Sequence, residues 1–101
     1  MGTIKLERGL FVGGEFNNSA RFKVFATLLV WAEDAPVTKE GEQLGRGELV
    51  TSLSRLSRRA SVTVKQARNA LAALVKLGKI VVRATPQHTV VTICDYDYYV
   101  V

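Results

Sequence analysis

The sequence predicts an α+β fold in which three helices are combined with a small antiparallel β-sheet. Apolar residues recur at intervals of three and four in three segments, 20–33, 53–60 and 64–77, as in helices that pack on one side. Two runs rich in β-branched residues follow, 80–84 and 89–93. The short stretch between these runs predicts that they pair as a β-hairpin.

Length and composition are typical of a single globular domain. The 101 residues suit one hydrophobic core, so we expect residues 1–101 to form one domain. Hydrophobic residues make up 48% of the chain and charged residues 23%, which excludes an intrinsically disordered chain. There is no apolar stretch of membrane-spanning length, no secretory signal and only one cysteine. We therefore expect a cytoplasmic protein without a membrane partner.

The first helix lies between two segments with weaker patterns. Residues 3–16 contain short apolar groups broken by glycines, which predicts a short strand or an extended arm. Capping residues at 17–19 precede the helix expected over 20–33. Apolar residues cover more than one side of this helix, so we expect the arm or a second subunit to pack on it. Residues 34–47 contain a proline and three glycines and predict a loop.

Two capped helices follow a short strand expected over 48–51. Ser52 is a good N-cap for the helix at 53–60. At the next helix, Thr63 and Gln66 have the spacing of a capping box, in which each side chain bonds to the other residue's backbone N–H.

A short helix, a three-residue turn and a longer helix predict a helix-turn-helix. With the hairpin that follows, the fold class is a winged helix-turn-helix. In this fold the second helix, here 64–77, lies in the major groove of DNA.

Positive charge is concentrated in one part of the chain. Residues 46–88 contain nine basic residues and a single acid, Glu48, although the whole chain has a net charge of only +5. Such a segment attracts a polyanion, and the usual one is DNA phosphate. The alternative is a solvated surface, but that usually mixes both signs. Double-stranded DNA is therefore the expected partner.

The polar residues on the outer side of the second helix are the candidates for base contacts. Arginine can bond to guanine through two hydrogen bonds, and glutamine or asparagine can do so to adenine. A glutamine that serves in the capping box is less available for this. The candidates on this helix are Lys65, Gln66, Arg68, Asn69 and Lys76. The candidates for phosphate contacts on the preceding helix and the hairpin are Arg55, Arg58, Arg59 and Arg83. The alternative is an ordinary amphipathic helix with a solvated side.

Catalysis is not expected from this sequence. One histidine and one cysteine do not make a zinc site. No lysine follows the Gly13-Gly14 pair, as a phosphate-binding loop requires. The serines of 52–61 have no histidine near them in the sequence. We expect no enzyme activity, no metal and no cofactor.

Four segments resemble the N-terminal winged-helix domain of phage-type and DnaD-like replication initiation proteins. They are residues 46–53 (RGELVTSL), 64–68 (VKQAR), 77–80 (LGKI) and 89–93 (TVVTI). The resemblance implies DNA binding in replication initiation, self-association and a further C-terminal domain in full-length members, so we expect this chain to be either a fragment or a stand-alone version. The sequence departs from the family pattern at Ser61, where glycine is common, at Arg58 and Arg59, where acids are usual, and at Trp31, which is often polar.

Two other functions fit the same fold. A transcriptional regulator would show the same sequence features. A protein-interaction or oligomerisation module without DNA contact is also consistent with the apolar first helix and with three tyrosines near the C-terminus, Tyr96, Tyr98 and Tyr99. A homo-oligomer would form through that helix or that tail.

Overall fold

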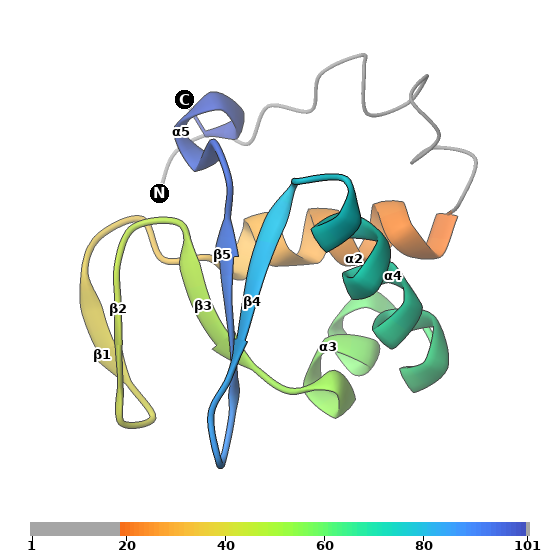
Figure 1. Ribbon diagram of the computed structural model, residues 1–101, viewed down its shortest axis with the longest axis horizontal. Coiled ribbons are helices and arrows are strands. Elements are labelled where there is room, and N and C mark those ends of the chain that lie inside the picture. Colours follow the sequence, from red (N-terminus) through yellow and green to blue (C-terminus); the bar gives the residue numbers. More distant parts are fainter. Residues whose placement is uncertain (1–18, 101) are drawn as a thin grey trace.

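The computed structural model describes residues 19–100, and the α+β class is confirmed over them. Four helices and two antiparallel sheets are present in this part of the chain, rather than three helices and one sheet (Figure 1). In chain order the elements are α2 (Ser19–Trp31), β1 (Val37–Lys39), β2 (Glu42–Leu44), β3 (Glu48–Thr51), α3 (Leu53–Ala60), α4 (Val64–Lys76), β4 (Ile80–Ala84), β5 (Thr89–Ile93) and α5 (Tyr96–Tyr99). The arm predicted over 3–16 lies outside the described residues.

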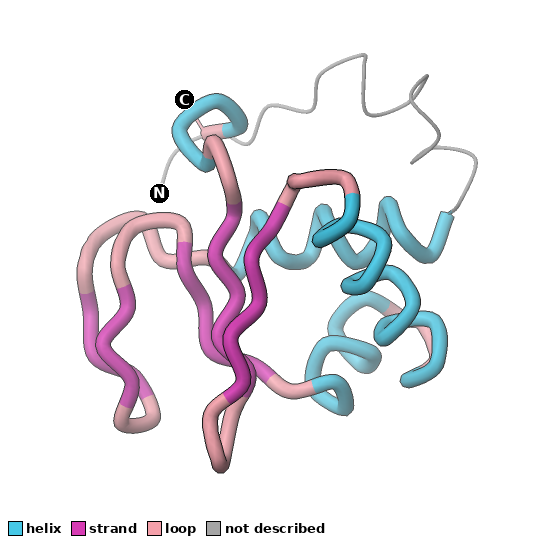
Figure 2. The backbone as a smooth tube through the Cα atoms, viewed as in Figure 1, coloured by secondary structure: helices cyan, strands magenta, loops and turns pink. Residues whose placement is uncertain are grey.

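A three-stranded antiparallel sheet with the order β3-β5-β4 separates two layers. Helices α2, α3 and α4 lie on one side, and the β1–β2 hairpin lies on the other (Figure 2). The strand register explains this division, because side chains alternate between the two faces of a strand. Leu49 pairs with Val91, and both belong to the core under the helices. Their neighbours Val50 and Val90 pair on the opposite face and pack with Leu44 of the hairpin.

The main core forms where α2 and α4 pack together. Phe25 and Leu28 of α2 and Leu74 of α4 are almost completely buried. The apolar residues in the middle of α4 are buried as their spacing predicts, whereas Val64 and Leu77 at its two ends are 41% and 48% exposed. The packing of this helix therefore leaves both of its ends accessible to solvent.

The caps predicted for α3 and α4 are confirmed, and they fix where these two helices begin. The Ser52 hydroxyl accepts a hydrogen bond from the backbone N–H of Arg55 at 3.1 Å. Thr63 and Gln66 form the complete capping box. Between the two helices, Ser61 adopts the left-handed conformation with φ 57°, so serine makes the turn for which the resemblance suggested glycine. Helix α4 ends at Lys76, one residue before the predicted end.

The loop predicted over 34–47 is wrong in its centre, because β1 and β2 form a hairpin there. Each strand has only three residues, too few to show an alternating pattern. Val37 and Leu44 cover the outer face of the three-stranded sheet. Glu40 and Gly41 form the turn with φ 51° and 81°, which matches the twist of a two-residue hairpin loop.

The helix predicted over 20–33 ends early, at Trp31. Beyond it the chain leaves the helix, because the backbone N–H of Glu33 donates a hydrogen bond to the carbonyl of Glu48.

The C-terminal tyrosines form the short helix α5 and belong in part to the core. Tyr96 and Tyr99 are buried, and the Tyr99 ring packs edge-on against Phe25 with 5.4 Å between ring centres. Of the three tyrosines proposed for an interaction surface, only Tyr98 is exposed, so the tail does not present all three rings to a partner. Arg46 fastens α5 to the turn before β3, since its side chain bonds to Asp97 and lies over the Tyr96 ring.

Glu48 joins this turn to the sheet through its carboxylate. Its Oε1 accepts a hydrogen bond from the N–H of Gly45 at 2.6 Å, and its Oε2 accepts one from the Thr92 hydroxyl at 2.8 Å. The bond from Gly45, followed by that from Thr92, lowers the pKa of Glu48 below its ordinary range.

We expect Glu48→Gln to reduce the stability of the protein in a pH-dependent manner. At pH 7 the variant should lose about 1 kcal/mol of unfolding free energy, because its hydrogen bonds lose the charge of the acceptor. A carboxyl with a lowered folded pKa stabilises the protein above its unfolded pKa of about 4.3, and this contribution disappears as pH falls through the folded value. Urea denaturation between pH 7 and pH 2 measures the difference. A difference that stays constant over this range would contradict the assignment.

Candidate nucleic-acid interface

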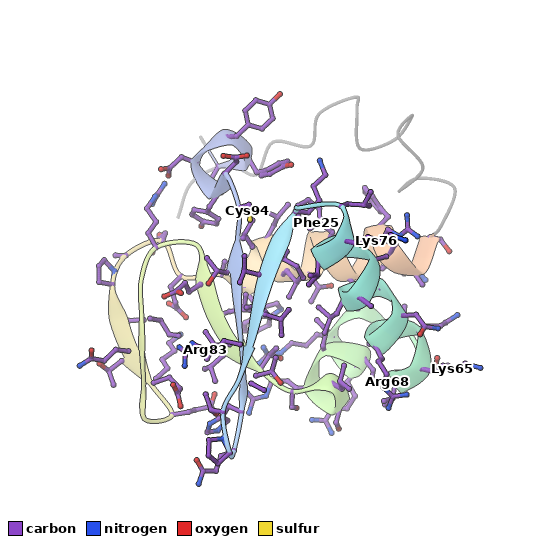
Figure 3. All side chains as sticks on the ribbon, in the orientation of Figure 1. Phe25, Lys65, Arg68, Lys76, Arg83 and Cys94 are labelled. Carbon is purple, nitrogen blue, oxygen red and sulfur yellow. The ribbon has the colours of Figure 1, made fainter. Side chains whose placement is uncertain are left out.

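The outer side of α4 carries a stripe of five exposed residues, four of them polar. At about 100° per residue, the stripe occupies an arc of roughly 100°, opposite the buried side of the helix. Its members are Lys65, Arg68, Asn69, Ala72 and Lys76, and all five are exposed. Lys65 and Arg68 project outward from the N-terminal half of α4, and Lys76 lies at its other end (Figure 3). We call these five residues the α4 stripe.

The cations of the α4 stripe are not paired with any acid in the part of the chain that the structure describes. Lys65, Arg68 and Lys76 form no ion pair with any residue between 19 and 100. Their charge is therefore available to an external anion.

Gln66, the fifth candidate on this helix, lies beside the stripe. Its Oε1 accepts a hydrogen bond from the N–H of Thr63 at 2.9 Å, so its side-chain carbonyl closes the capping box. The structure thus gives Gln66 a role in starting α4.

Arg55 is paired within the protein. Its guanidinium donates two hydrogen bonds to the Glu40 carboxylate, from Nη1 to Oε2 at 2.8 Å and from Nη2 to Oε1 at 3.0 Å. His88, in the β4–β5 loop, places its Nε2 at 3.4 Å from the same Oε1. The hydrogen bond from Arg55 is the main cause of a lowered pKa at Glu40, and the charges of His88 and Arg59 act in the same direction.

The other two arginines of α3 have different surroundings. The guanidinium carbon of Arg59 lies 3.6 Å from the centre of the Trp31 ring, in a cation–π contact. Arg58 is exposed and forms no ion pair with a described residue. Of the three arginines of α3, Arg58 alone is therefore neither paired with an acid nor stacked on a ring among the described residues.

Arg83 points away from α4. In the register of β4 and β5 it pairs with Val90, whose side chain lies on the face covered by the β1–β2 hairpin. Its Nη1 is 3.8 Å from Oε1 of Glu42 in β2. Figure 3 shows Arg83 on the hairpin side of the sheet, across the strands from Lys65 and Arg68. The nine predicted residues therefore do not form one continuous surface.

Three residues near these arginines were not predicted to belong to the site. Glu40 and Glu42 lie outside the basic segment in the sequence, yet the β1–β2 hairpin brings them to Arg55 and Arg83. Trp31 was noted only as a departure from a family pattern. The apolar residues Val37 and Leu44, spaced around a Glu-Gly pair, were the available signal for this hairpin.

The α5 end of the molecule holds a surface hollow of about 620 Å³, lined in part by Arg46, Lys79 and Tyr98. It lies at the opposite end from the turns of both hairpins (Figure 1). Residues 19–100 contain no group of His, Cys, Asp and Glu side chains suited to a metal ion. None of their helices is long and apolar enough to cross a bilayer.

Comparison with protein-family models, with curated proteins and with solved structures gives no match to this chain.

Proposed function

We propose that this chain is a winged helix-turn-helix domain that binds duplex DNA without catalysing a reaction. In this proposal α3 and α4 form the helix-turn-helix, α4 enters the major groove, and the β4–β5 hairpin is the wing. The order of these elements and the pairing of β3 with β5 support the assignment. A role in replication initiation, rather than in transcription, rests on the resemblance of the sequence motifs.

The observation that carries the proposal is the α4 stripe with its unpaired cations. A recognition helix needs donors that reach base edges and a surface without acids that would repel phosphate. Arg68 and Asn69, near the start of α4, are the candidates for base contacts. Lys65, Lys76 and Arg58 are the candidates for phosphate contacts.

A salt titration of duplex DNA binding tests the function. With Arg68 and the three phosphate candidates engaged, we expect the plot of log affinity against log salt to have a slope of about −3 to −4. Lys65→Ala should make this slope less negative by about 0.9. Lys23→Ala, which removes an exposed lysine of α2, is the matched control and should leave the slope nearly unchanged. Weak binding that is insensitive to salt would contradict the proposal.

A protein-interaction module is the second candidate, and the exposed end of α2 favours it. Val30 and Trp31 are 49% and 48% exposed, and Trp and Arg are enriched at protein interfaces. The same titration separates the two functions, because such a module would not bind DNA even at low salt.

A further inference from the structure

The contact between Arg55 and Glu40 has the geometry with which arginine binds phosphate. Two parallel hydrogen bonds of 2.8 and 3.0 Å join the guanidinium to the two carboxylate oxygens. Arginine recognises carboxylates and phosphates through this same forked arrangement. An oxyanion is therefore already bound at the start of α3, and it is a side chain of the protein itself.

A second element contributes to the same anion. The ring of His88 faces Glu40 from the β4–β5 loop, with Nε2 at 3.4 Å from Oε1. Backbone and hydroxyl groups of Thr85 hold this loop closed through hydrogen bonds of 2.8 to 3.1 Å to His88. The guanidinium from α3 and the imidazole from the loop thus lie around one carboxylate.

This site is open to solvent. The side chains of Arg55 and Glu40 are 31% and 38% exposed, so an external anion can reach both. An exposed ion pair of this kind contributes little to stability, because water screens it. An incoming phosphate can therefore displace the carboxylate at small cost.

We propose that Arg55 and His88 form a phosphate site at the edge of the DNA interface, and that Glu40 occupies this site while DNA is absent. The inference rests on the proposed function, in which α3 and the β4–β5 loop flank the groove entered by α4. Glu40 then competes with DNA and lowers its affinity. In the complex, the displaced Glu40 carboxylate remains near the DNA phosphate. It keeps one salt cation close to the site, so DNA binding releases fewer counterions than the number of phosphates contacted.

Removal of the Glu40 charge tests the proposal. Glu40→Gln should bind duplex DNA about two- to fivefold more tightly at a given salt concentration, the range expected when one exposed ion pair is lost. Its log–log salt slope should be more negative by about 0.9, the value for one phosphate. Glu40→Asn is a second variant that suits the positive φ at this position, and thermal denaturation establishes that both remain folded.

Two controls separate competition at this site from a general change in charge. Asp95→Asn removes an exposed acid at the opposite end of the molecule and should change the affinity much less. In an Arg55→Ala background, Glu40→Gln should no longer increase the affinity. Equal effects of Glu40→Gln and Asp95→Asn, an unchanged slope, or an increase that persists without Arg55 would overturn the proposal.

The result also distinguishes this inference from the proposed function. If the wild-type protein binds DNA through the α4 stripe and Glu40→Gln has no effect, only the phosphate site at Arg55 is wrong. If neither the wild-type protein nor Glu40→Gln binds DNA at low salt, both the proposed function and the phosphate site are wrong.

Discussion

Replacement of Gly47 by alanine should lower the free energy of unfolding by about 2–5 kcal/mol, the sum of a backbone and a packing cost. Gly47 has φ 83°, a conformation that costs an alanine about 1–2 kcal/mol. A Cβ atom here would lie 2.8 Å from Cβ and 3.0 Å from Cγ of Tyr96, which is overpacking of a kind that costs about 1–3 kcal/mol. The backbone of Gly47 forms hydrogen bonds to Glu33 and Ile93, so the chain cannot shift easily to relieve the clash with Tyr96.

Gly78→Ala is the matched control for this substitution. Gly78 has a similar φ of 75°, but an added Cβ would meet nothing within 4 Å. Urea denaturation of both variants should therefore give a cost for Gly78→Ala that contains the backbone part alone. Equal costs for the two variants would contradict the claim that a Cβ atom at position 47 overpacks against Tyr96.

The double substitution Lys65→Ala/Arg68→Ala should weaken duplex DNA binding by about 2–4 kcal/mol, roughly 30- to 1000-fold, from one base contact and one phosphate contact. Both residues are exposed and make no ion pair with a described residue, and alanine favours helices. The stability of the fold should therefore change by less than about 0.5 kcal/mol. Fluorescence anisotropy with labelled duplexes, beside thermal denaturation, measures both quantities.

The single variant Arg68→Ala shows which kind of contact Arg68 makes. If it contacts a base, the loss of about 1–3 kcal/mol should be confined to a preferred sequence. An equal loss on every duplex would identify a phosphate contact instead. Lys23→Ala again serves as the control, and an equal effect of that variant would contradict a role specific to α4.

Elements defined by local signals could be predicted closely from the sequence. The starts of α3 and α4 follow from Ser52 and from the Thr63–Gln66 pair, because a capping hydrogen bond depends only on residues two or three positions apart. The β4–β5 hairpin follows from two runs of β-branched residues.

Elements that depend on tertiary packing could not be predicted. Strands β1 and β2 have three residues each and pair because Val37 and Leu44 cover one face of the sheet. Their turn has Glu40 before Gly41, where asparagine or aspartate would be the usual residue, so the turn signal in the sequence is weak. The four residues of α5 form where Tyr96 and Tyr99 reach the core, which their sequence alone does not indicate.

The candidate site also contains residues whose placement follows from local spacing and residues whose surroundings depend on tertiary contacts. Helical spacing alone predicts that Lys65, Arg68 and Lys76 share one side of α4. The surroundings of Arg55 and Arg83 could not be predicted, because their acidic partners come from a hairpin that lies earlier in the chain. A charge count along a segment therefore overestimates the charge available to DNA.

The most direct test of the central claim is an NMR titration of the isotope-labelled protein with duplex DNA at low salt. Binding by the α4 stripe predicts that the largest amide shift changes lie along α4, from Lys65 to Lys76. Smaller changes should occur at the start of α3 and in the β4–β5 loop. Changes confined to the end of α2 around Trp31 and to α5, with α4 unaffected, would contradict the claim that α4 binds DNA.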